Sequence, residues 1–178
     1  MVYSYKDMLP IQKLPEILAA GKLLSADQIT KAQTEAECKA LSLEECILKK
    51  RLATPDRLYK AAADFFKLPF ITLLGVVIPP EVLGLVSEPI ARTHQVIPYA
   101  KEGETLKVAL LDPDDFQTLE FIEKKTGLAL ALTMTDPDSM ADALKQYKKT
   151  LEAEFSEISK VSKKPVEELA QEAPVIRI

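Results

Sequence analysis

The sequence VIPYAKEGETLKVALLD, from Val96 to Asp112, decides the fold that the rest of the chain must accommodate. Its two ends, VIPYA and TLKVALLD, have the apolar and β-branched composition of strands. The residues between them, 101–104, are polar and include a glycine, which is typical of a hairpin with a longer loop. In the second strand Leu106, Val108 and Leu110 take every other position, which predicts burial of one face. We therefore expect this hairpin to be the centre of a small α/β unit.

The composition is that of a globular protein with one or two modest domains. Of 178 residues, 47% are hydrophobic and 28% are charged, which is an ordinary folded mixture. The net charge is −4, and no Lys/Arg run is interleaved with aromatic residues, so nucleic acid is a disfavoured partner. No apolar run approaches the roughly 20 residues needed to span a bilayer, and residues 1–20 lack a signal-peptide pattern. These features predict a cytoplasmic protein without a direct membrane span.

Metal and nucleophile chemistry have little support in the sequence. Cys38, Cys46 and a single histidine, His94, are too few for a tetrahedral zinc site. We expect both cysteines to be free thiols that are buried or half-buried. His94 has no Ser or Cys partner placed by the sequence, and we expect it to end a helix.

The acidic cluster after the hairpin has two interpretations. Asp112, Asp114 and Asp115 surround Pro113 and could be read as a metal cluster. A strand stop followed by a helix cap explains them better, since proline lacks an amide hydrogen and Asp favours the N-cap position. The five glycines are scattered and no phosphate-binding glycine loop is present. We therefore predict no catalytic, cofactor-binding or metal-binding residues.

A repeat precedes the hairpin. Residues 14–32 and 43–61 match at an offset of 29 residues, a length typical of helical supersecondary units. In each copy a short helix, a turn and a second helix are expected, with Ser25 and Thr54 as N-caps of the second helices. Pro55 falls at the first helical position, which tolerates proline. Four helices in two pairs would share one small core.

Further elements are expected on both sides of the hairpin. Residues 66–73 are expected to end the repeat and start a strand. A helix is predicted from 81 to 95, in which Pro89 predicts a break or a second short helix. A helix over 114–126 and a last helix over 140–155 are expected to cover the sheet, while the apolar strand 128–135 is expected inside it. The predicted core consists of Leu106, Val108, Leu110, Phe116, Leu119, Ile122, Leu130 and Leu132, with Phe121 as a further candidate.

The expected fold class is α+β. Residues 1–12 form a lead-in, 13–66 a helical repeat subdomain and 67–155 a small α/β sandwich subdomain. Residues 156–178 turn polar and then end in APVIRI, which predicts a linker and the start of a missing further domain. On these residues alone the chain is a soluble, two-part binding or assembly module.

The order of the motifs resembles a known family. The doubled helical unit is followed by LPFI from residue 68, PEVL from 80, AR-x-x-x-VIP from 91 and L-x-VA-x-x-DP from 106. This order is similar to the N-terminal region of type II secretion and type IV pilus assembly ATPases, the MshEN-type domain. The resemblance covers most of residues 13–178. It implies a hexameric parent motor whose ATP, magnesium and Walker motifs lie in later domains, so we expect no enzyme activity in this fragment.

Some members of that family bind cyclic di-GMP through the helical repeat. Their motif resembles Arg-Leu-Gly at the start of each unit and Gln at its end. Here those places hold Lys13-Leu14-Pro15 with Ala36, and Ser42-Leu43-Glu44 with Phe65. Proline and glutamate oppose the close backbone approach that glycine permits, and a carboxylate repels phosphate. We therefore expect no cofactor in this fragment and no cyclic dinucleotide at micromolar concentration.

The resemblance leaves three functional hypotheses. The first is a docking or regulatory module that links a cytoplasmic motor to its inner-membrane platform or to a scaffold partner. The second is a cyclic di-GMP-sensing domain, and the third is a receiver-like domain unrelated to pili. For the first, Leu14, Leu43, Phe65 and Phe66 are the candidate protein interface, as an exposed apolar patch. The alternative is that these side chains fill the joint between repeat and sheet.

Overall fold

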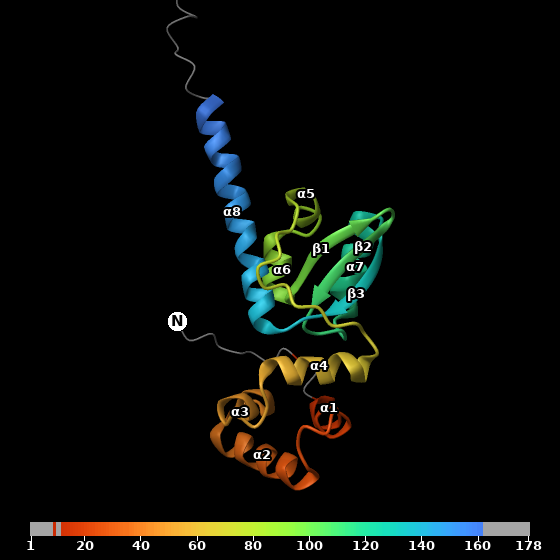
Figure 1. Cartoon of the computed structure of the whole chain (residues 1–178), viewed down its shortest axis with the longest axis vertical. Coiled ribbons are helices and arrows are strands. Elements are labelled where there is room, and N and C mark those ends of the chain that lie inside the picture. Colours follow the sequence, from red (N-terminus) through yellow and green to blue (C-terminus); the bar gives the residue numbers. More distant parts are fainter. Residues whose placement is uncertain (1–8, 10–11, 162–178) are drawn as a thin grey trace, which may run out of the picture.

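The computed structural model describes Leu9 and residues 12–161 (Figure 1). The expected lead-in, apart from residues 9 and 12, and the chain after residue 161 lie outside the described residues. The helices are α1 (Leu14–Ala20), α2 (Ala26–Lys39), α3 (Leu43–Lys49), α4 (Pro55–Phe66), α5 (Pro80–Leu83), α6 (Glu88–His94), α7 (Phe116–Thr126) and α8 (Pro137–Val161). The strands are β1 (Val96–Glu102), β2 (Thr105–Leu110) and β3 (Ala129–Met134).

The repeat is confirmed in the backbone of α1–α4. Lys22 and Arg51, which are 29 residues apart, both adopt left-handed conformations, with φ of 50° and 56°. After each comes the same hydrogen bond back into the first helix, over 3.0 Å in both copies, as in a Schellman turn. Ser25 caps α2 in a reciprocal capping box with Gln28, as expected. Thr54 occupies the N-cap of α4 but its side chain makes no capping hydrogen bond.

The four helices pack around one apolar centre. Gly21 allows α1 to approach α4 closely, because a Cβ at this position would lie 2.7 Å from Ala61 Cβ. The most deeply buried side chains of this centre are Ile17, Leu18, Ile47, Leu58 and Tyr59. Figure 1 shows the four helices gathered below the sheet, with α4 nearest to it.

The hairpin prediction is confirmed, but β2 rather than β3 is the central strand. β1 pairs with β2 antiparallel, and β2 pairs with β3 parallel, in the order β1-β2-β3. The expectation that strand 128–135 lies inside the sheet is therefore wrong. The segment after α4 makes only one bridge to β3, between Phe70 and Met134, so the strand expected from 66 to 73 does not form. Beyond that bridge the amides of the segment bind α8 side chains instead.

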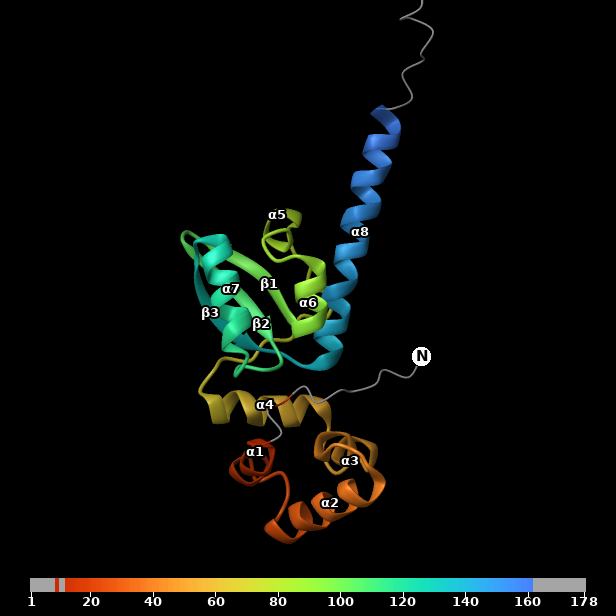
Figure 2. The same ribbon diagram turned by 180° about the vertical axis from the view of Figure 1, so that it is seen from behind.

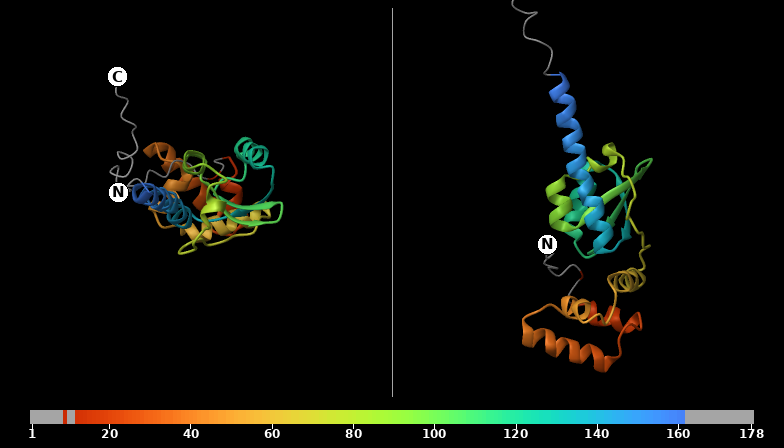
Figure 3. Two further views of the ribbon diagram at one scale, coloured as in Figure 1. Left: turned by 90° about the horizontal axis from the view of Figure 1, so that it is seen from above. Right: turned by 60° about the vertical axis from the view of Figure 1, so that its left-hand side comes forward.

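Helices cover the sheet from more than one side. In Figure 2 α7 lies in front of the sheet, while in Figure 1 the segment between α4 and α5 crosses the opposite face. Seen from above in Figure 3, α7 and α8 lie on different sides of the strands. The sheet is thus enclosed between helices and an extended segment, as a small sandwich.

The predicted core is correct in β2 and partly wrong in α7 and β3. Every predicted β2 position is fully buried, and Leu119 and Ile122 of α7 are also buried. Phe116 and Phe121 are 69% and 50% exposed, against expectation. The buried stripe of α7 runs through Leu119 and Ile122, and both phenylalanines lie about 100° round the helix from it. Leu130 and Leu132 of β3 are only half-buried.

The structure also tests the predictions for the helix over 81–95, the last helix and the two cysteines. The predicted helix 81–95 is broken, as expected, into α5 and α6, with Pro89 in the first turn of α6. α8 runs to Val161, six residues into the expected linker. Cys46 is buried, but Cys38 is exposed because it lies on the outer face of α2, so that prediction is wrong for Cys38. Within residues 12–161 no helix is long and apolar enough to cross a membrane.

Candidate functional site

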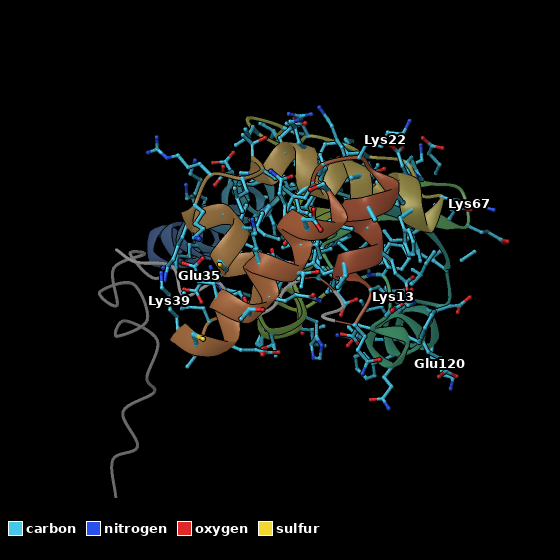
Figure 4. All side chains as sticks on the ribbon, turned by 90° about the horizontal axis from the view of Figure 1, so that it is seen from below. Lys13, Lys22, Glu35, Lys39, Lys67 and Glu120 are labelled. Atoms are coloured by element: carbon cyan, nitrogen blue, oxygen red, sulfur yellow. The ribbon has the colours of Figure 1, made fainter. Side chains whose placement is uncertain are left out.

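The first candidate ligand residue, Lys13, is already engaged. It is the N-cap residue of α1, and its Nζ lies 2.7 Å from Asp114 Oδ2 and 5.2 Å from the centroid of the Phe66 ring. Figure 4 shows Lys13 beside α7, where the repeat meets the α/β part. Both side chains of the ion pair are partly exposed, so it contributes at most about 1 kcal/mol. The charge of Lys13 therefore joins the two parts of the chain.

Four of the other candidate ligand positions of the repeat, Pro15, Ala36, Ser42 and Leu43, line a surface groove between α1 and the α2–α3 turn. The groove has a volume of about 490 Å³. Its lining residues are Pro15, Gln33, Ala36, Glu37, Ala40, Leu41, Ser42 and Leu43. None of these carries a positive charge, and Glu37 carries a negative one. A phosphate placed here would meet a carboxylate and no lining cation, whereas phosphate sites rely on Arg forks, Lys or clusters of amides.

Glu44, at the family's glycine position in the second copy, faces the interior. Its side chain is 3% exposed, and its Oε1 accepts a hydrogen bond of 2.6 Å from the Tyr59 hydroxyl. Its Oε2 accepts a hydrogen bond of 3.3 Å from the Leu9 amide. A buried carboxylate needs such donors to offset the loss of water. Glu44 therefore holds the repeat together from inside.

The expected apolar interface is not an exposed patch. Leu14 is 2% exposed and Leu43 is 9% exposed, and both belong to the core. Phe65 and Phe66 are half-buried against that core and contact each other edge to face, with ring centroids 5.3 Å apart. The expectation is therefore wrong for the two leucines as surface residues. A docking role for the exposed edges of the two phenylalanines stays a prediction.

The acidic residues after β2 act as the predicted strand stop and helix cap. Asp112 Oδ1 accepts a hydrogen bond of 2.9 Å from the Asp114 amide, and burial raises the pKa of Asp112. Asp115 is the N-cap of α7 and accepts from the Thr118 amide at 3.2 Å. The carboxylates thus serve separate partners. Throughout the described part of the chain, no group of three or more His, Cys, Asp or Glu side chains could hold a metal ion.

His94 ends α6, as predicted, and lies in a cluster that the sequence did not indicate. Its Nδ1 lies 2.7 Å from Asp115 Oδ2 and 2.8 Å from Thr118 Oγ1. Burial alone would raise the pKa of Asp115, but the hydrogen bonds with Thr118 and His94 outweigh it and lower that pKa. A hydrolytic triad needs the acid and the nucleophile on different ring nitrogens. Here both contact one nitrogen, so the cluster stabilises the start of α7.

A second groove, of about 560 Å³, follows the outer face of α2. Glu35 lies at its centre and pairs with Lys39, at 2.7 Å, and with Lys50. Hydrogen bonds from these two lysines lower the pKa of Glu35, and Figure 4 labels Glu35 and Lys39 on this helix. Of the three charged residues that line the groove, Glu35 and Lys50 pair with each other, and Lys31 makes no ion pair within the described residues.

The last group of polar side chains that the sequence analysis missed lies on α8. Ser139, Asp142 and Gln146 occupy one helix face, and they bind the backbone of the segment Leu73–Ile78, which begins with a turn closed by a hydrogen bond from the Val76 amide to Leu73 O. The bonds are Leu73 N–H to Ser139 Oγ (3.0 Å), Gly75 N–H to Asp142 Oδ2 (3.1 Å), Ile78 N–H to Gln146 Oε1 (2.9 Å) and Gln146 Nε2–H to Val76 O (2.8 Å). The sequence could have indicated this face of α8, because these three polar residues recur at helical spacing beside the buried stripe of the same helix.

The described residues form a helical repeat joined to a three-stranded α/β unit. Comparison with known proteins identifies which class this is. The MshEN domain family matches residues 66–154, and this chain belongs to that family. The receiver-like alternative is thereby excluded.

Individual relatives agree with this assignment. The chain is 30% identical over 133 residues to the type IV pilus assembly ATPase PilB of Thermus thermophilus, and 24% identical over 135 residues to PilB of Myxococcus xanthus. These matches cover 74% and 76% of this chain but only 15% and 24% of the relatives. The chain is homologous to N-terminal regions of PilB and spans a quarter or less of their length.

Solved structures show the same fold. The structure of MshE with cdg, cyclic di-GMP, matches at 19% identity and a TM-score of 0.64, covering 75% of this chain and 97% of the MshE chain. The N-terminal domain of XpsE matches at 19% identity and a TM-score of 0.57, covering 79% of this chain and 97% of the other. The predicted α+β fold and the resemblance are confirmed.

Proposed function

We propose that this chain is the N-terminal docking and regulatory module of a motor ATPase for type IV pilus assembly or type II secretion. It links the motor to an inner-membrane platform protein or to a scaffold partner. The module has no enzyme activity of its own, and ATP and magnesium act in other domains of the parent, a homohexamer. In this proposal the module is cytoplasmic and reaches the inner membrane only through its partners.

The observation that supports the proposal is that candidate ligand residues of the repeat make contacts within the protein. Lys13 is bound to Asp114, and Glu44 is buried under Tyr59. The groove beside them has no cation among its lining residues. A repeat whose candidate ligand residues serve internal contacts supports a role as a structural support for docking.

The second candidate function is cyclic di-GMP sensing. It is favoured by the likeness to MshE, whose structure was solved with cyclic di-GMP, and by the groove at the equivalent positions. A ligand that binds only the folded state must raise the unfolding temperature. The two candidates therefore differ in one measurable quantity.

The test of the proposal has two parts. Isothermal titration calorimetry with cyclic di-GMP should show no binding at micromolar concentration, and a thermal shift scan should show no stabilisation. Surface plasmon resonance should detect binding to the purified cytoplasmic domain of the platform or scaffold protein from the same machine. Micromolar dinucleotide binding together with no binding to either protein would replace docking by sensing.

A further inference from the structure

The charges of this chain are divided unequally between its two parts. Residues 13–67, the repeat, contain ten Lys or Arg and eight Asp or Glu, whereas residues 68–161 contain nine Lys or Arg and fifteen Asp or Glu. The repeat is therefore positive and the α/β part negative at neutral pH. Opposite charge on two surfaces of one molecule favours contact between copies of that molecule.

The positive charge of the repeat gathers where α2 and α3 end. Lys39 and Lys50 both pair with Glu35, Lys31 lines the same groove as Lys50, and Lys49 pairs with Glu45. The exposed cations of this surface, named the basic patch, are Lys31, Lys39, Lys49, Lys50 and Arg51.

The basic patch keeps a net positive charge and carries an apolar residue. Its acids are Glu35, Glu45 and Asp27, which lies one helical turn before Lys31, so the five cations exceed them. Leu52 follows Arg51 directly and is 38% exposed. In the described part of the repeat, Leu52 is the one large apolar side chain that is exposed.

A patch of opposite charge surrounds the start of α7. Lys13, His94 and Lys124 each pair with one of its acids, so negative charge remains in excess. Phe116 lies among these acids and is 69% exposed. The acids of this surface, named the acidic patch, are Asp112, Asp114, Asp115, Glu120 and Glu123.

The two patches lie on opposite sides of the molecule. Figure 4 shows Glu35 and Lys39 on the left and Glu120 at the lower right. In Figure 1, too, α3 and α7 lie on different sides of the chain. The basic patch therefore does not reach the acidic patch of the same copy, and both remain available to other copies.

We propose that the basic patch of one copy binds the acidic patch of a neighbouring copy, with Leu52 packed against Phe116. Because the two surfaces differ, each bound copy still offers one free patch, and the contact continues from copy to copy as a ring or a chain. This inference goes beyond docking, since it says how the modules of one motor contact each other. It needs no platform or scaffold protein.

Other occupants fit only one of the two patches. An anionic membrane would attract the basic patch and leave the acidic patch with Phe116 uncovered. A basic segment of another protein would cover the acidic patch alone. A second copy of this chain supplies opposite charge and an apolar residue to both.

The contact between free chains should be weak and sensitive to salt. Exposed ion pairs contribute about 0–1 kcal/mol each, and salt screens them. Modules held together in one motor meet at effective concentrations in the millimolar range. A weak contact is therefore sufficient within the assembly, and the free chain must be measured at high concentration.

The experiment is sedimentation velocity of the whole chain at up to about 1 mM. We expect species larger than a dimer in about 0.1 M salt and a monomer in about 1 M salt, where the Debye length falls from about 10 Å to about 3 Å. Arg51→Glu and Phe116→Lys should each weaken association at least about tenfold. Both side chains are exposed, so the variants should stay folded, which circular dichroism checks.

Two variants serve as matched controls. Lys101→Glu makes the same reversal of charge at an exposed position of β1. Phe121→Lys makes the same replacement at the other exposed phenylalanine of α7, about 140° round the helix from Phe116. Both controls should associate like the wild type.

A mixture of the two patch variants tests the direction of the contact. Arg51→Glu keeps an intact acidic patch, and Phe116→Lys keeps an intact basic patch. Each variant alone should be monomeric, while an equimolar mixture should form a dimer and nothing larger, because the remaining patches are both altered.

The other outcomes overturn the proposal. A wild type that is monomeric at about 1 mM in low salt excludes the contact, as do patch variants that associate like the wild type. A wild type that stops at a dimer, or a mixture that stays monomeric, excludes pairing of the two different patches. If the monomeric wild type sediments with phosphatidylglycerol vesicles and Arg51→Glu does not, the basic patch is a membrane contact. Binding to the platform or scaffold protein is measured separately, so docking stands or fails independently.

Discussion

The hydrogen bond between Tyr59 and Glu44 makes a quantitative prediction about the repeat. Tyr59→Phe keeps the aromatic ring and removes only the hydroxyl, which donates to Glu44 Oε1 over 2.6 Å. Tyr59 is fully buried and Glu44 is 3% exposed, so water does not replace the lost donor. Removing a hydrogen bond to a buried carboxylate costs about 1.5–3 kcal/mol. We expect Tyr59→Phe to lower the free energy of unfolding by about 2 kcal/mol.

The assay is urea unfolding at neutral pH followed by far-UV circular dichroism, because the chain has no tryptophan. For a chain of this size, about 2 kcal/mol corresponds to a fall in Tm of about 4–8 °C. Tyr99→Phe is the matched control. Its hydroxyl lies 3.1 Å from Thr133 Oγ1 in a half-buried, neutral pair, so its loss should cost about 1 kcal/mol or less.

The opposite outcome would be a Tyr59→Phe variant within about 0.5 kcal/mol of the wild type, or a larger loss of stability in Tyr99→Phe. Either result would mean that Glu44 does not depend on Tyr59 for its burial. Glu44 would then not stabilise the repeat from inside.

Four other predictions follow from packing, backbone conformation and charge. Gly21→Ala should lower the free energy of unfolding by about 1–3 kcal/mol, because its Cβ would lie 2.7 Å from Ala61 Cβ. The double variant with Ala61→Gly should lose less stability than the sum of the two single variants, and strict additivity in urea melts would contradict the contact. Ala40→Gly should stabilise by about 1 kcal/mol, since Ala40 has a φ of 51° at the end of α2, and an unchanged Tm would argue against strain there. The lowered pKa of Asp115 gives stability that is fully present above the unfolded-state pKa of 3.8 and is lost as pH falls through the lower folded-state pKa. The wild type should therefore lose more stability than Asp115→Asn between about pH 5 and about pH 2.5. Parallel pH profiles of the two proteins would exclude this contribution. Val108→Asp would place an unpaired carboxylate at a fully buried position of β2 and should abolish the cooperative melt of the α/β part, so a near wild-type melt would show that the core is misassigned.

The local features of this protein were readable in its sequence. The hairpin around residues 101–104, the caps at Ser25 and Asp115 and the second short helix that carries Pro89 in its first turn each depend on interactions within a few residues. Such interactions are set by residue type and spacing: proline lacks an amide hydrogen, and short polar side chains accept from nearby amides. The repeat was visible for the same reason, since two copies of one local pattern fold in the same way.

The tertiary structure alone decided which apolar residues are exposed and which polar residues are enclosed. Phe116 and Leu119 are both apolar residues of α7, yet only Leu119 faces the sheet, because the sheet covers one narrow stripe of the helix. The run of apolar residues in β3 predicted an inner strand, but the segment that could have paired with it turns away to α8.

The functional surfaces were decided in the same non-local way. Lys13 and Asp114 are 101 residues apart in sequence, and Gln146 binds a backbone segment about 70 residues before it. No periodicity links such residues, because their meeting depends on how whole elements pack. The sequence by itself therefore determined most of the elements and the family of this protein. Packing at a distance determined that Lys13 and Glu44 serve the fold while Leu74, Val76 and Val77 face outward.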